Sequence, residues 1–368
     1  MLSISNTNVS HKDFVDVDWK VIAVVMPTFK DVPRKEYEMT LNRRHFLTVA
    51  ALAPAALAIP SIPGLVGIAS AQNSVPTGQR LSIAMRRKIG EIEVFALMDG
   101  YGSFPNAMFP SFNVDAGAAA AKAARKPFDP THFNIGINAY LIKTKGRIIA
   151  VDAGAPAAMS PTTGGWARAL SAVGVLPEQI DTIFLTHIHA DHVGGLADPA
   201  SGKKFLPNAQ LIASETEWNF VHDEKVYSAY PADFKPLVDI SRAMVKPYDS
   251  VKSLVQPGAE IAPGITTVAL AGHTPGHLGL RIDSGSEGLL IWGDIIHGTA
   301  FQFTQPDWSF AFDFDQAKAA DIRKKTLDMV KSDDLMVAGM HLDFPGFGYV
   351  ESAGTSYRFI AAPYDYRA

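Results

Sequence analysis

The sequence contains no cysteine among its 368 residues. This absence excludes disulfide bonds, thiolate metal ligands and a cysteine nucleophile, so a metal site would have to use nitrogen and oxygen ligands. No long run of lysine or arginine stands out either, and the net charge is −4, a balance that does not favour nucleic acid as a partner. Hydrophobic residues make up 47% of the chain, which is enough for a large core and too many for a disordered protein.

Four potential metal ligands stand close together after a short apolar run. Residues 186–192 read Thr-His-Ile-His-Ala-Asp-His and follow Ile-Phe-Leu at 183–185. A strand that ends in such a loop can direct His187 and His189 to one cation, while Asp191 and His192 reach a neighbouring one. The alternative is a polar loop that is rich in histidine without binding anything.

Three later segments each place one more ligand after an apolar run. His273 stands in a Gly/Pro turn after 266–270, Asp294 follows 289–292, and His341 follows 335–338. Buried strands whose ends meet at one edge of a sheet show this pattern. Taken singly, His273 could be a turn histidine, Asp294 a helix cap and His341 a core histidine.

The whole pattern resembles the metallo-β-lactamase superfamily, whose signature is His-x-His-x-Asp-His followed by distant His, Asp and His. The likeness runs from about residue 80 onward. Within the superfamily the chain is most similar to the methyl parathion hydrolase and N-acyl-homoserine-lactone lactonase group. Three stretches carry this narrower likeness: Asn-Ala-Tyr-Leu-Ile at 138–142, Gly-His-Thr-Pro-Gly-His at 272–277 and His-Leu-Asp-Phe-Pro-Gly at 341–346.

The resemblance implies a four-layer αββα sandwich and two divalent metal ions. Zinc is expected, with manganese, iron and cobalt as alternatives. The first ion would be held by His187, His189 and His273, and the second by Asp191, His192 and His341. Asp294 would bridge the ions.

The two carboxylates of this site, Asp191 and Asp294, are the candidate catalytic residues. The bridging Asp294 disfavours a true β-lactamase, which lacks this carboxylate. His189 disfavours a flavin-linked di-iron oxygen reductase, which has a carboxylate at that position.

The implied activity is that of an exported dinuclear-metal hydrolase. A hydroxide shared by the ions would attack a lactone or ester carbonyl, or the phosphorus of an organophosphate triester. The sequence does not rank these substrates. A β-lactamase and a general aryl or carboxylic esterase remain alternatives, and a non-catalytic scaffold or binding protein is the alternative outside enzymes.

Two side chains are expected to orient the ligands. Asp152 ends the strand 147–151 and is predicted to accept the free N–H of a ligand histidine, although a turn aspartate is the alternative. His277 is either a second orienting group or a polar turn residue.

Aromatic residues crowd the irregular stretches 101–112 and 301–312, and others follow the ligand segments. Core packing must explain most of them, but proline-containing loops are less able to bury every ring, so some are expected to wall the metal cleft. Such a wall favours a small, uncharged, apolar substrate. The residues predicted to line it are Phe104, Phe109, Trp218, Phe303, Trp308 and Phe344.

The N-terminal region resembles a twin-arginine export signal. Residues 41–47 read Leu-Asn-Arg-Arg-His-Phe-Leu, an apolar stretch runs to about residue 68, and Ala-Ser-Ala at 69–71 fits a cleavage site. A membrane anchor or a buried helix is the alternative, but Pro54, Pro60 and Pro63 interrupt the segment too often for a stable spanning helix. We expect passage through the twin-arginine export machinery, cleavage after about Ala71 and a periplasmic or secreted product.

Three segments are therefore expected along the chain. Met39 is predicted to be the true start, which would make 1–38 an extension outside the translated protein, followed by the signal at 39–71 and the hydrolase domain at 72–368. Whether the domain forms a homodimer stays open.

Alternating apolar patterns predict an α/β domain. The expected helices are 116–124, 166–173, one from about 215, 233–245 and 314–330. The expected strands are 80–84, 91–97, 136–142, 147–151, 180–185, 209–213, 266–270, 278–282, 289–292 and 335–338.

Overall fold

The structure is a computed structural model that describes residues 84–367. The predicted export signal at 39–71, the predicted start at Met39 and most of the expected strand 80–84 lie outside the described residues. Within 84–367, every helix is too short or too polar to cross a membrane.

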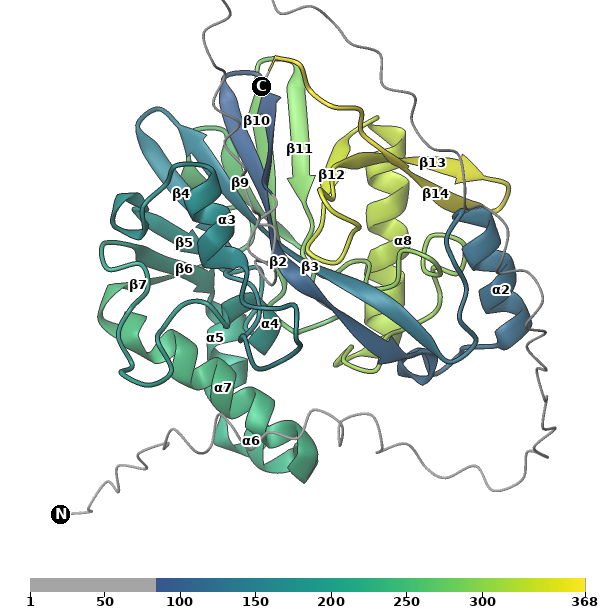
Figure 1. The fold of residues 1–368 in the computed structure, drawn as a ribbon, viewed down its shortest axis with the longest axis horizontal. Coiled ribbons are helices and arrows are strands. Elements are labelled where there is room, and N and C mark those ends of the chain that lie inside the picture. Colours follow the sequence, from purple (N-terminus) through teal and green to yellow (C-terminus); the bar gives the residue numbers. More distant parts are fainter. Residues whose placement is uncertain (1–83, 368) are drawn as a thin grey trace, which may run out of the picture. The chain divides into compact units, whose positions relative to one another are not determined.

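Two seven-stranded sheets form the centre of the domain (Figure 1). The first sheet follows the order of the chain, with β1 (Ala84–Ile89), β2 (Ile92–Pro105), β3 (His132–Thr144), β4 (Arg147–Val151), β5 (Thr182–Phe184), β6 (Gln210–Ser214) and β7 (Lys252–Val255). The second sheet also keeps chain order, with β8 (Glu260–Ala262), β9 (Ile265–Ala269), β10 (Leu278–Ser284), β11 (Glu287–Ile291), β12 (Met336–Ala338), β13 (Gly348–Ala353) and β14 (Ser356–Ala361).

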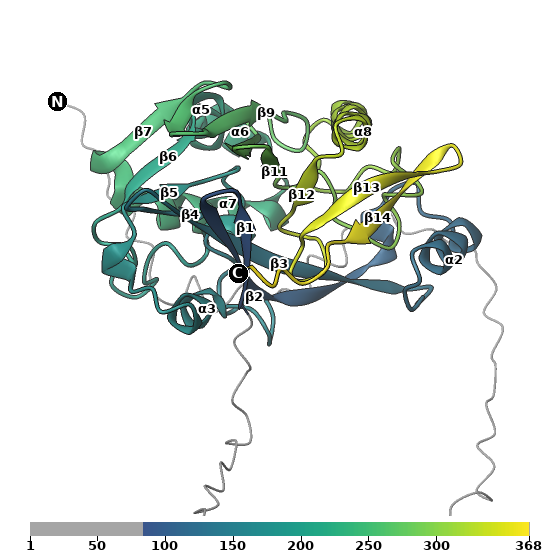
Figure 2. The same ribbon diagram turned by 90° about the horizontal axis from the view of Figure 1, so that it is seen from above.

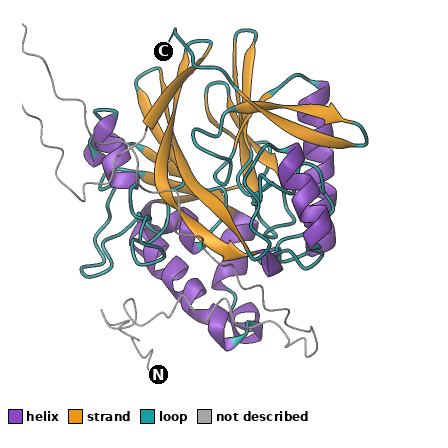
Figure 3. Ribbon diagram, turned by 45° about the vertical axis from the view of Figure 1, so that its right-hand side comes forward, coloured by secondary structure: helices purple, strands orange, loops and turns teal. Residues whose placement is uncertain are grey.

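Helices lie on the outer faces of the two sheets (Figures 1 and 3). Five helices lie in the connections between strands β4 and β7 of the first sheet: α3 (Trp166–Ala172), α4 (Ala190–Val193), α5 (Glu215–His222), α6 (Glu224–Ala229) and α7 (Lys235–Val245). The second sheet is covered by α8 (Gln316–Ser332), while α2 (Val114–Ala123) lies beyond the long strands β2 and β3. The expected four-layer αββα sandwich is confirmed.

Alternation along the strands explains why the sheets face each other. In β3, Tyr140 and Ile142 point into a core shared with Leu280 and Ile291 of the second sheet. Leu141, between them, points to the opposite core under the helices. Because successive side chains of a strand point to opposite faces, one apolar run supplies both layers.

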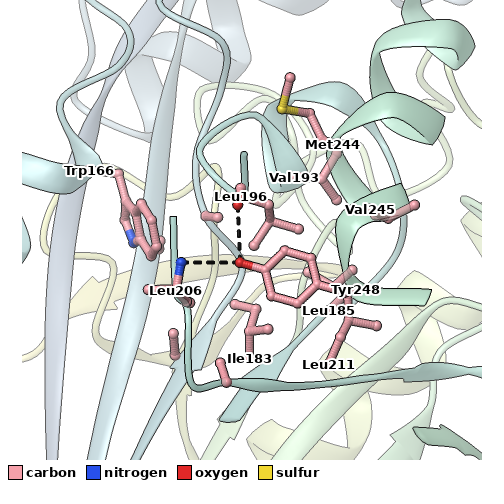
Figure 4. Close-up of a cluster of buried hydrophobic side chains, with 14 of the residues drawn as sticks. Trp166, Ile183, Leu185, Val193, Leu196, Leu206, Leu211, Met244, Val245 and Tyr248 are labelled. Atoms are coloured by element: carbon pink, nitrogen blue, oxygen red, sulfur yellow. Dashed lines mark hydrogen bonds between the residues drawn. The ribbon is translucent and has the colours of Figure 1, made fainter. Parts of the chain in front are cut away.

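The core under α3, α5 and α7 also anchors the segment that carries the first ligands. Ile183 and Leu185 from β5 and its end pack there with Val193, which directly follows His192 (Figure 4). Tyr248 lies in the same core, and its hydroxyl donates to Leu196 O at 3.0 Å and accepts from Leu206 N at 3.2 Å. The loop after β5 is thus fixed on both sides by buried residues.

Neighbouring parallel strands bring the functional segments to one edge. Strands β4, β5 and β6 are parallel, as are β11 and β12. Asp152 follows β4, the ligand run follows β5, Asp294 follows β11 and His341 follows β12. Figure 2 shows how the two sheets lie beside each other, so that these strand ends can meet.

Two features differ from the expectation. The pair β2–β3 is longer than predicted, and its register continues to Phe104↔Phe133 and Pro105↔His132. This extension packs against α2 and the loop around Phe301 in an aromatic cluster of its own. The sequence pattern also did not predict β7, β8, β13 or β14, which are short, or half exposed and rich in polar residues.

Candidate metal centre

All seven predicted ligands meet at the shared strand edge. His189 caps the four-residue helix α4, which projects Asp191 and His192 from one turn. The other four come from the ends of β5, β9, β11 and β12. Among the described residues, four groups of three potential ligands have ligand atoms within 4.8 Å of one another, and two of them reproduce the predicted sets: His187, His189 and His273 as the first group, and Asp191, His192 and His341 as the second. A third, His187, His192 and Asp294, links these two groups.

Distances within the first group are those of side chains directed at a common point. The Nδ1 atom of His189 lies 3.1 Å from Nε2 of His187 and 3.1 Å from Nε2 of His273. In the second group, Oδ2 of Asp191 lies 3.6 Å from Nε2 of His192 and 3.4 Å from Nε2 of His341.

Asp294 contacts both groups. Its Oδ2 lies 3.3 Å from Nε2 of His273 and 3.1 Å from Nε2 of His341, and its Oδ1 lies 3.3 Å from Nε2 of His192. Asp294 is only 3% exposed. This position between the groups is the one that a bridging carboxylate requires.

The donor set fits divalent metal ions. Nε2 of His192 and Oδ1 of Asp294 are buried and have no hydrogen-bond partner among the described residues. Buried polar atoms are normally paired, because leaving one unpaired costs about 1–3 kcal/mol. Five imidazoles and two carboxylates, with no sulfur, suit zinc and similar ions.

Electrostatics favour the metal-binding protonation states at His187, His189 and Asp294. Burial lowers the pKa of His187 well below its ordinary value and that of His189 to about 3, which keeps both imidazoles neutral. Burial would raise the pKa of Asp294, but the imidazoles of His192 and His341 outweigh it and hold that pKa well below its usual range. Neutral imidazole and ionised carboxylate are the ligand forms. At His192 and His341, burial would lower the pKa, but the neighbouring carboxylates, Asp294 foremost, outweigh it and raise that pKa, so a metal ion would have to displace a proton there.

Asp152 lies where the sequence predicts an orienting carboxylate. It is fully buried, its Oδ2 is 2.7 Å from Nδ1 of His192, and it accepts hydrogen bonds from the backbone N–H and the hydroxyl of Thr186. The residue adopts a left-handed conformation with φ 58°, which aims the carboxylate back at the ligand loop. The contact leaves Nε2 of His192 free for a metal ion.

His277 holds backbone groups of two ligand loops and not a ligand side chain. Its Nδ1 lies 3.0 Å from Leu270 O, and its Nε2 accepts the N–H of Asp294 at 3.1 Å. Gly293 has φ +55°, and a Cβ there would collide with the His277 ring. His277 therefore fixes the turn that presents Asp294.

Asp313 orients a ligand in the same way, and the sequence did not single it out. Its Oδ1 lies 2.8 Å from Nδ1 of His273, while its Oδ2 accepts from Phe310 N at 2.7 Å and contacts Arg323 at 3.4 Å. Burial would raise the pKa of Asp313, but the hydrogen bond to His273 outweighs it and lowers that pKa to about 2. The aspartate stands in the middle of an aromatic loop, so only its contact with His273 reveals it.

Replacing Asp313 with asparagine should weaken metal binding. The amide keeps the size of the side chain but loses the charge that fixes the His273 ring, and loss of such a partner typically costs about 10–100-fold in metal affinity. Competition titration with a coloured chelator measures this change. Asp307→Asn, an exposed aspartate of the same loop paired with Lys324, is the control, and equal metal affinity in Asp313→Asn and this control would contradict the assignment.

His297 is a second residue that sequence reasoning missed. Its Nε2 lies 3.1 Å from Oδ2 of Asp294, its Nδ1 has no partner among the described residues, and its ring stacks on Phe310 at 4.4 Å. It belongs to a further group of potential ligands with His273 and Asp294. A histidine three positions after Asp294 was the available signal.

A cavity of about 610 Å³ opens onto the centre. His189, Asp191, Asp294 and His297 form part of its floor, and no Lys or Arg is among the lining residues of the described chain. The apolar walls come from β2 and β3, the loop 159–163, the segment 230–238 and the loop 310–314. Side chains that form these walls are Phe104, Met108, Ile135, Ile137, Met159, Phe220, Tyr230, Phe234, Leu237, Phe310, Phe312 and Phe314.

Of the six aromatic residues predicted to line the cleft, Phe104 does so and five do not. Phe109 and Trp308 pack in the aromatic cluster beside α2, Phe303 packs under α8, Trp218 packs under the first sheet, and Phe344 packs against the core between the sheets. The prediction was wrong for these five because sequence alone cannot tell which face of an aromatic loop turns inward. Tyr230 and Phe234 line the cavity as well, from a segment that the sequence did not single out for the cleft.

The chain belongs to the metallo-β-lactamase superfamily. The family model for this superfamily matches residues 134–341, which is more than half of the chain. This span contains every residue of the two ligand groups and Asp294.

Curated relatives are distant. An uncharacterised protein of Bacillus subtilis, YobT, is 26% identical over 183 residues, covering 48% of this chain and 70% of its own. A probable metallo-hydrolase of Mycobacterium tuberculosis is 28% identical over 142 residues, covering 36% of this chain and 42% of its own. An N-acyl homoserine lactonase of Bacillus thuringiensis is 22% identical over 177 residues, covering 43% of this chain and 62% of its own.

Solved structures cover more of the chain. AidC, a dizinc quorum-quenching lactonase, has a TM-score of 0.72 and 28% identity, covering 77% of this chain and 99% of AidC. The hydrolase AbOPH of the β-lactamase superfamily has a TM-score of 0.73 and 28% identity, covering 78% of this chain and 100% of AbOPH. These similarities support a metal-dependent hydrolase.

Proposed function

We propose that the protein is a dinuclear metal-dependent hydrolase of uncharged esters, with lactones as the leading substrates. One observation carries this proposal: members of both ligand groups and Asp294 line a mostly apolar cavity, and no Lys or Arg is among its lining residues in the described part of the chain. An anionic substrate would find no Lys or Arg partner there. The lactonase AidC, which is similar over most of the chain, favours lactones among the neutral esters.

The protein side chains prepare the site in three ways. Divalent ions bound by the two groups would activate a water molecule and polarise the acceptor oxygen of the substrate. Asp152 and Asp313 fix the rings of His192 and His273 by accepting or sharing their Nδ1 protons. His297 lines the cavity, and its Nε2 lies 3.1 Å from Oδ2 of Asp294, so its ring helps to hold that carboxylate in place.

Paired assays test this proposal. The purified protein, loaded with zinc, should hydrolyse an acyl lactone and leave a β-lactam or an anionic phosphate diester untouched. Opening of the lactone ring releases a proton, which can be measured in a weakly buffered solution with a pH indicator. Turnover of the β-lactam or the diester, without turnover of the lactone, would contradict the proposal.

Neutral aryl phosphotriesters are the second candidate. Rings line the cavity next to the ligand side chains: Phe310 stacks on His297, and Phe312 lies 6.5 Å from the His189 ring. Such rings can pack against an aryl leaving group. The same assay with a dialkyl aryl phosphotriester, followed by absorbance of the released phenol, ranks this substrate against the lactone.

Longer apolar substituents should bind more tightly. Each buried methylene contributes up to about 0.8 kcal/mol, which is about a fourfold change in KM. Phe234 lines the cavity and its ring lies 5.5 Å from that of Phe312. Phe234→Ala should therefore raise KM for long acyl chains more than for short ones, with little change in kcat, as measured over a series of acyl lactones.

Trp308→Ala is the control for this series. Trp308 packs in the aromatic cluster behind the cavity wall and does not itself line the cavity. Its loss should therefore lower the free energy of unfolding by about 3–5 kcal/mol without a chain-length effect on KM. A flat profile with chain length in the wild type would contradict the apolar-cavity argument.

We also propose export through the twin-arginine machinery, on the basis of the arginine pair at 43–44 and the apolar stretch that follows. That machinery moves folded proteins, which suits an enzyme that receives its metal before crossing. Lys-Lys at 43–44 in place of Arg-Arg should retain the precursor in the cytoplasm, as fractionation and immunoblotting would show. Unchanged export of this variant would contradict the proposal.

A further inference from the structure

Glu217 is a buried carboxylate that joins two ligand loops. It lies on α5, directly after β6, and is 0% exposed. Ser214 caps this helix and accepts the backbone N–H of Glu217 at 3.3 Å, which fixes where the side chain starts. Burying a carboxylate costs free energy unless hydrogen bonds replace its water, and Glu217 accepts three such bonds.

Its two oxygens face different segments. Oε1 accepts the N–H of Ile188 at 3.1 Å, and Ile188 stands between His187 and His189. Oε2 accepts the hydroxyl of Thr274 at 2.6 Å and the N–H of Gly276 at 3.1 Å, in the turn that begins at His273. Gly276 approaches the backbone of Glu217 so closely that a Cβ would have no room.

The contacts of Glu217 lie next to residues of the first ligand group, although the loop after β5 also carries Asp191 and His192 of the second. The first group consists of His187, His189 and His273, and these are the residues on either side of the contacts made by Glu217. The ring nitrogens of the second group have other partners: His192 is held by Asp152, and His341 by the carbonyl of Gly136 at 2.8 Å. Glu217 has no hydrogen bond to any of these.

We infer that Glu217 is a positioning residue for the first ion: it clamps the His187–His189 loop to the His273 turn, so that the three imidazoles of the first group converge. The clamp acts on the backbone and not on the imidazole rings. A ligand constellation loses affinity when its supports allow displacements of about 1 Å. The inference rests on the proposed metal-dependent function for the presence of ions, but it does not depend on the substrate.

Glu217→Gln tests the clamp, because it keeps the size of the side chain but replaces one oxygen with an NH₂ group. That group cannot accept a hydrogen bond from Ile188 N or Gly276 N, so one of the two loops must be released. Titration of the metal-free protein with ¹¹³Cd²⁺, followed by ¹¹³Cd NMR, resolves the two ions. We expect the first site to weaken about 10–100-fold, while the second, which shares only Asp294 with it, weakens clearly less.

Three further variants make the result specific. Asp152→Asn should weaken the opposite site, which assigns each resonance to its group. Glu215→Gln changes an exposed glutamate of the same helix, whose side chain bonds to Gln256, and should leave both sites unchanged. Thr274→Val removes only the hydroxyl that donates to Glu217. It should weaken the same site as Glu217→Gln, by a smaller factor. If Glu217→Gln does not fold, this variant tests the clamp in its place.

Equal weakening of both sites, or full affinity at both with only a lower melting temperature, would overturn the clamp and leave Glu217 a general support of the fold. A wild-type protein that binds no ion would instead defeat the proposed function. The two failures are therefore distinguishable in one titration.

Discussion

Replacing Asp294 with alanine should reduce hydrolysis by roughly a thousandfold or more, since loss of several kcal/mol of transition-state stabilisation corresponds to that factor. Asp294 contacts ligands of both groups at 3.1–3.3 Å and is buried between them. Its removal takes away the shared negative charge and leaves two cations to repel each other. Bound metal and melting temperature should fall together with kcat.

Asp321→Ala is a matched control, because this aspartate is exposed on α8 and pairs only with Lys325 one turn away. Such surface pairs contribute little to stability, so activity and metal content should stay at the wild-type level. Near-normal turnover of Asp294→Ala with full metal content would rule out a dinuclear site and reopen the β-lactamase alternative.

Removing the metal should abolish activity altogether. The ligand set predicts about two divalent ions per chain, measurable by elemental analysis of protein purified without chelator. After chelation, turnover should disappear and return when zinc, manganese or cobalt is added. The melting temperature should drop as well, because an ion present at 100 times its Kd stabilises the folded state by about 2.7 kcal/mol.

Activity that persists in protein with less than about a tenth of an ion per chain would contradict a metal-dependent mechanism. If fully active protein held one ion per chain, metal dependence would stand and only the second metal site would be contradicted. Trp308→Ala changes a residue of the aromatic cluster and no metal ligand, so it loses stability without losing a ligand. Comparing its activity and metal content with those of chelated wild-type protein separates loss of metal from loss of fold.

Most central strands could be predicted because they are buried on both faces. Apolar runs such as those of β5, β11 and β12 are fully buried, and continuous burial leaves a continuous hydrophobic signal. The hairpin β13–β14 gave no such signal. One face of it is exposed and its pairing partners supply the stabilisation, for example Val350 opposite Phe359.

The ligand side chains were predictable for a different reason. His187, His189, Asp191 and His192 lie within six residues, so the spacing itself limits where they can point. His273, Asp294 and His341 each end a buried strand, and strand ends at one sheet edge are brought together by the fold class. Asp152 follows the same rule.

Three residues that support the site were not predicted from the sequence. Glu217 and Asp313 owe their place to contacts with segments distant in the chain. His297 lies only three positions after Asp294, but its ring is placed by stacking on Phe310 and His341.

Most of the residues that line the cavity were not predicted either. Phe104 and Trp308 lie in similar aromatic stretches, yet of these two only Phe104 lines the cavity. The sequence by itself determined an α/β domain, the edge of the sheet where chemistry occurs and the ligand types, because these follow from local spacing and periodicity, while the four-layer sandwich was implied by the family resemblance. Only the tertiary structure decided that Asp313 and Glu217 also support the ligands and which rings line the cavity, because burial and side-chain direction depend on packing between elements far apart in the chain.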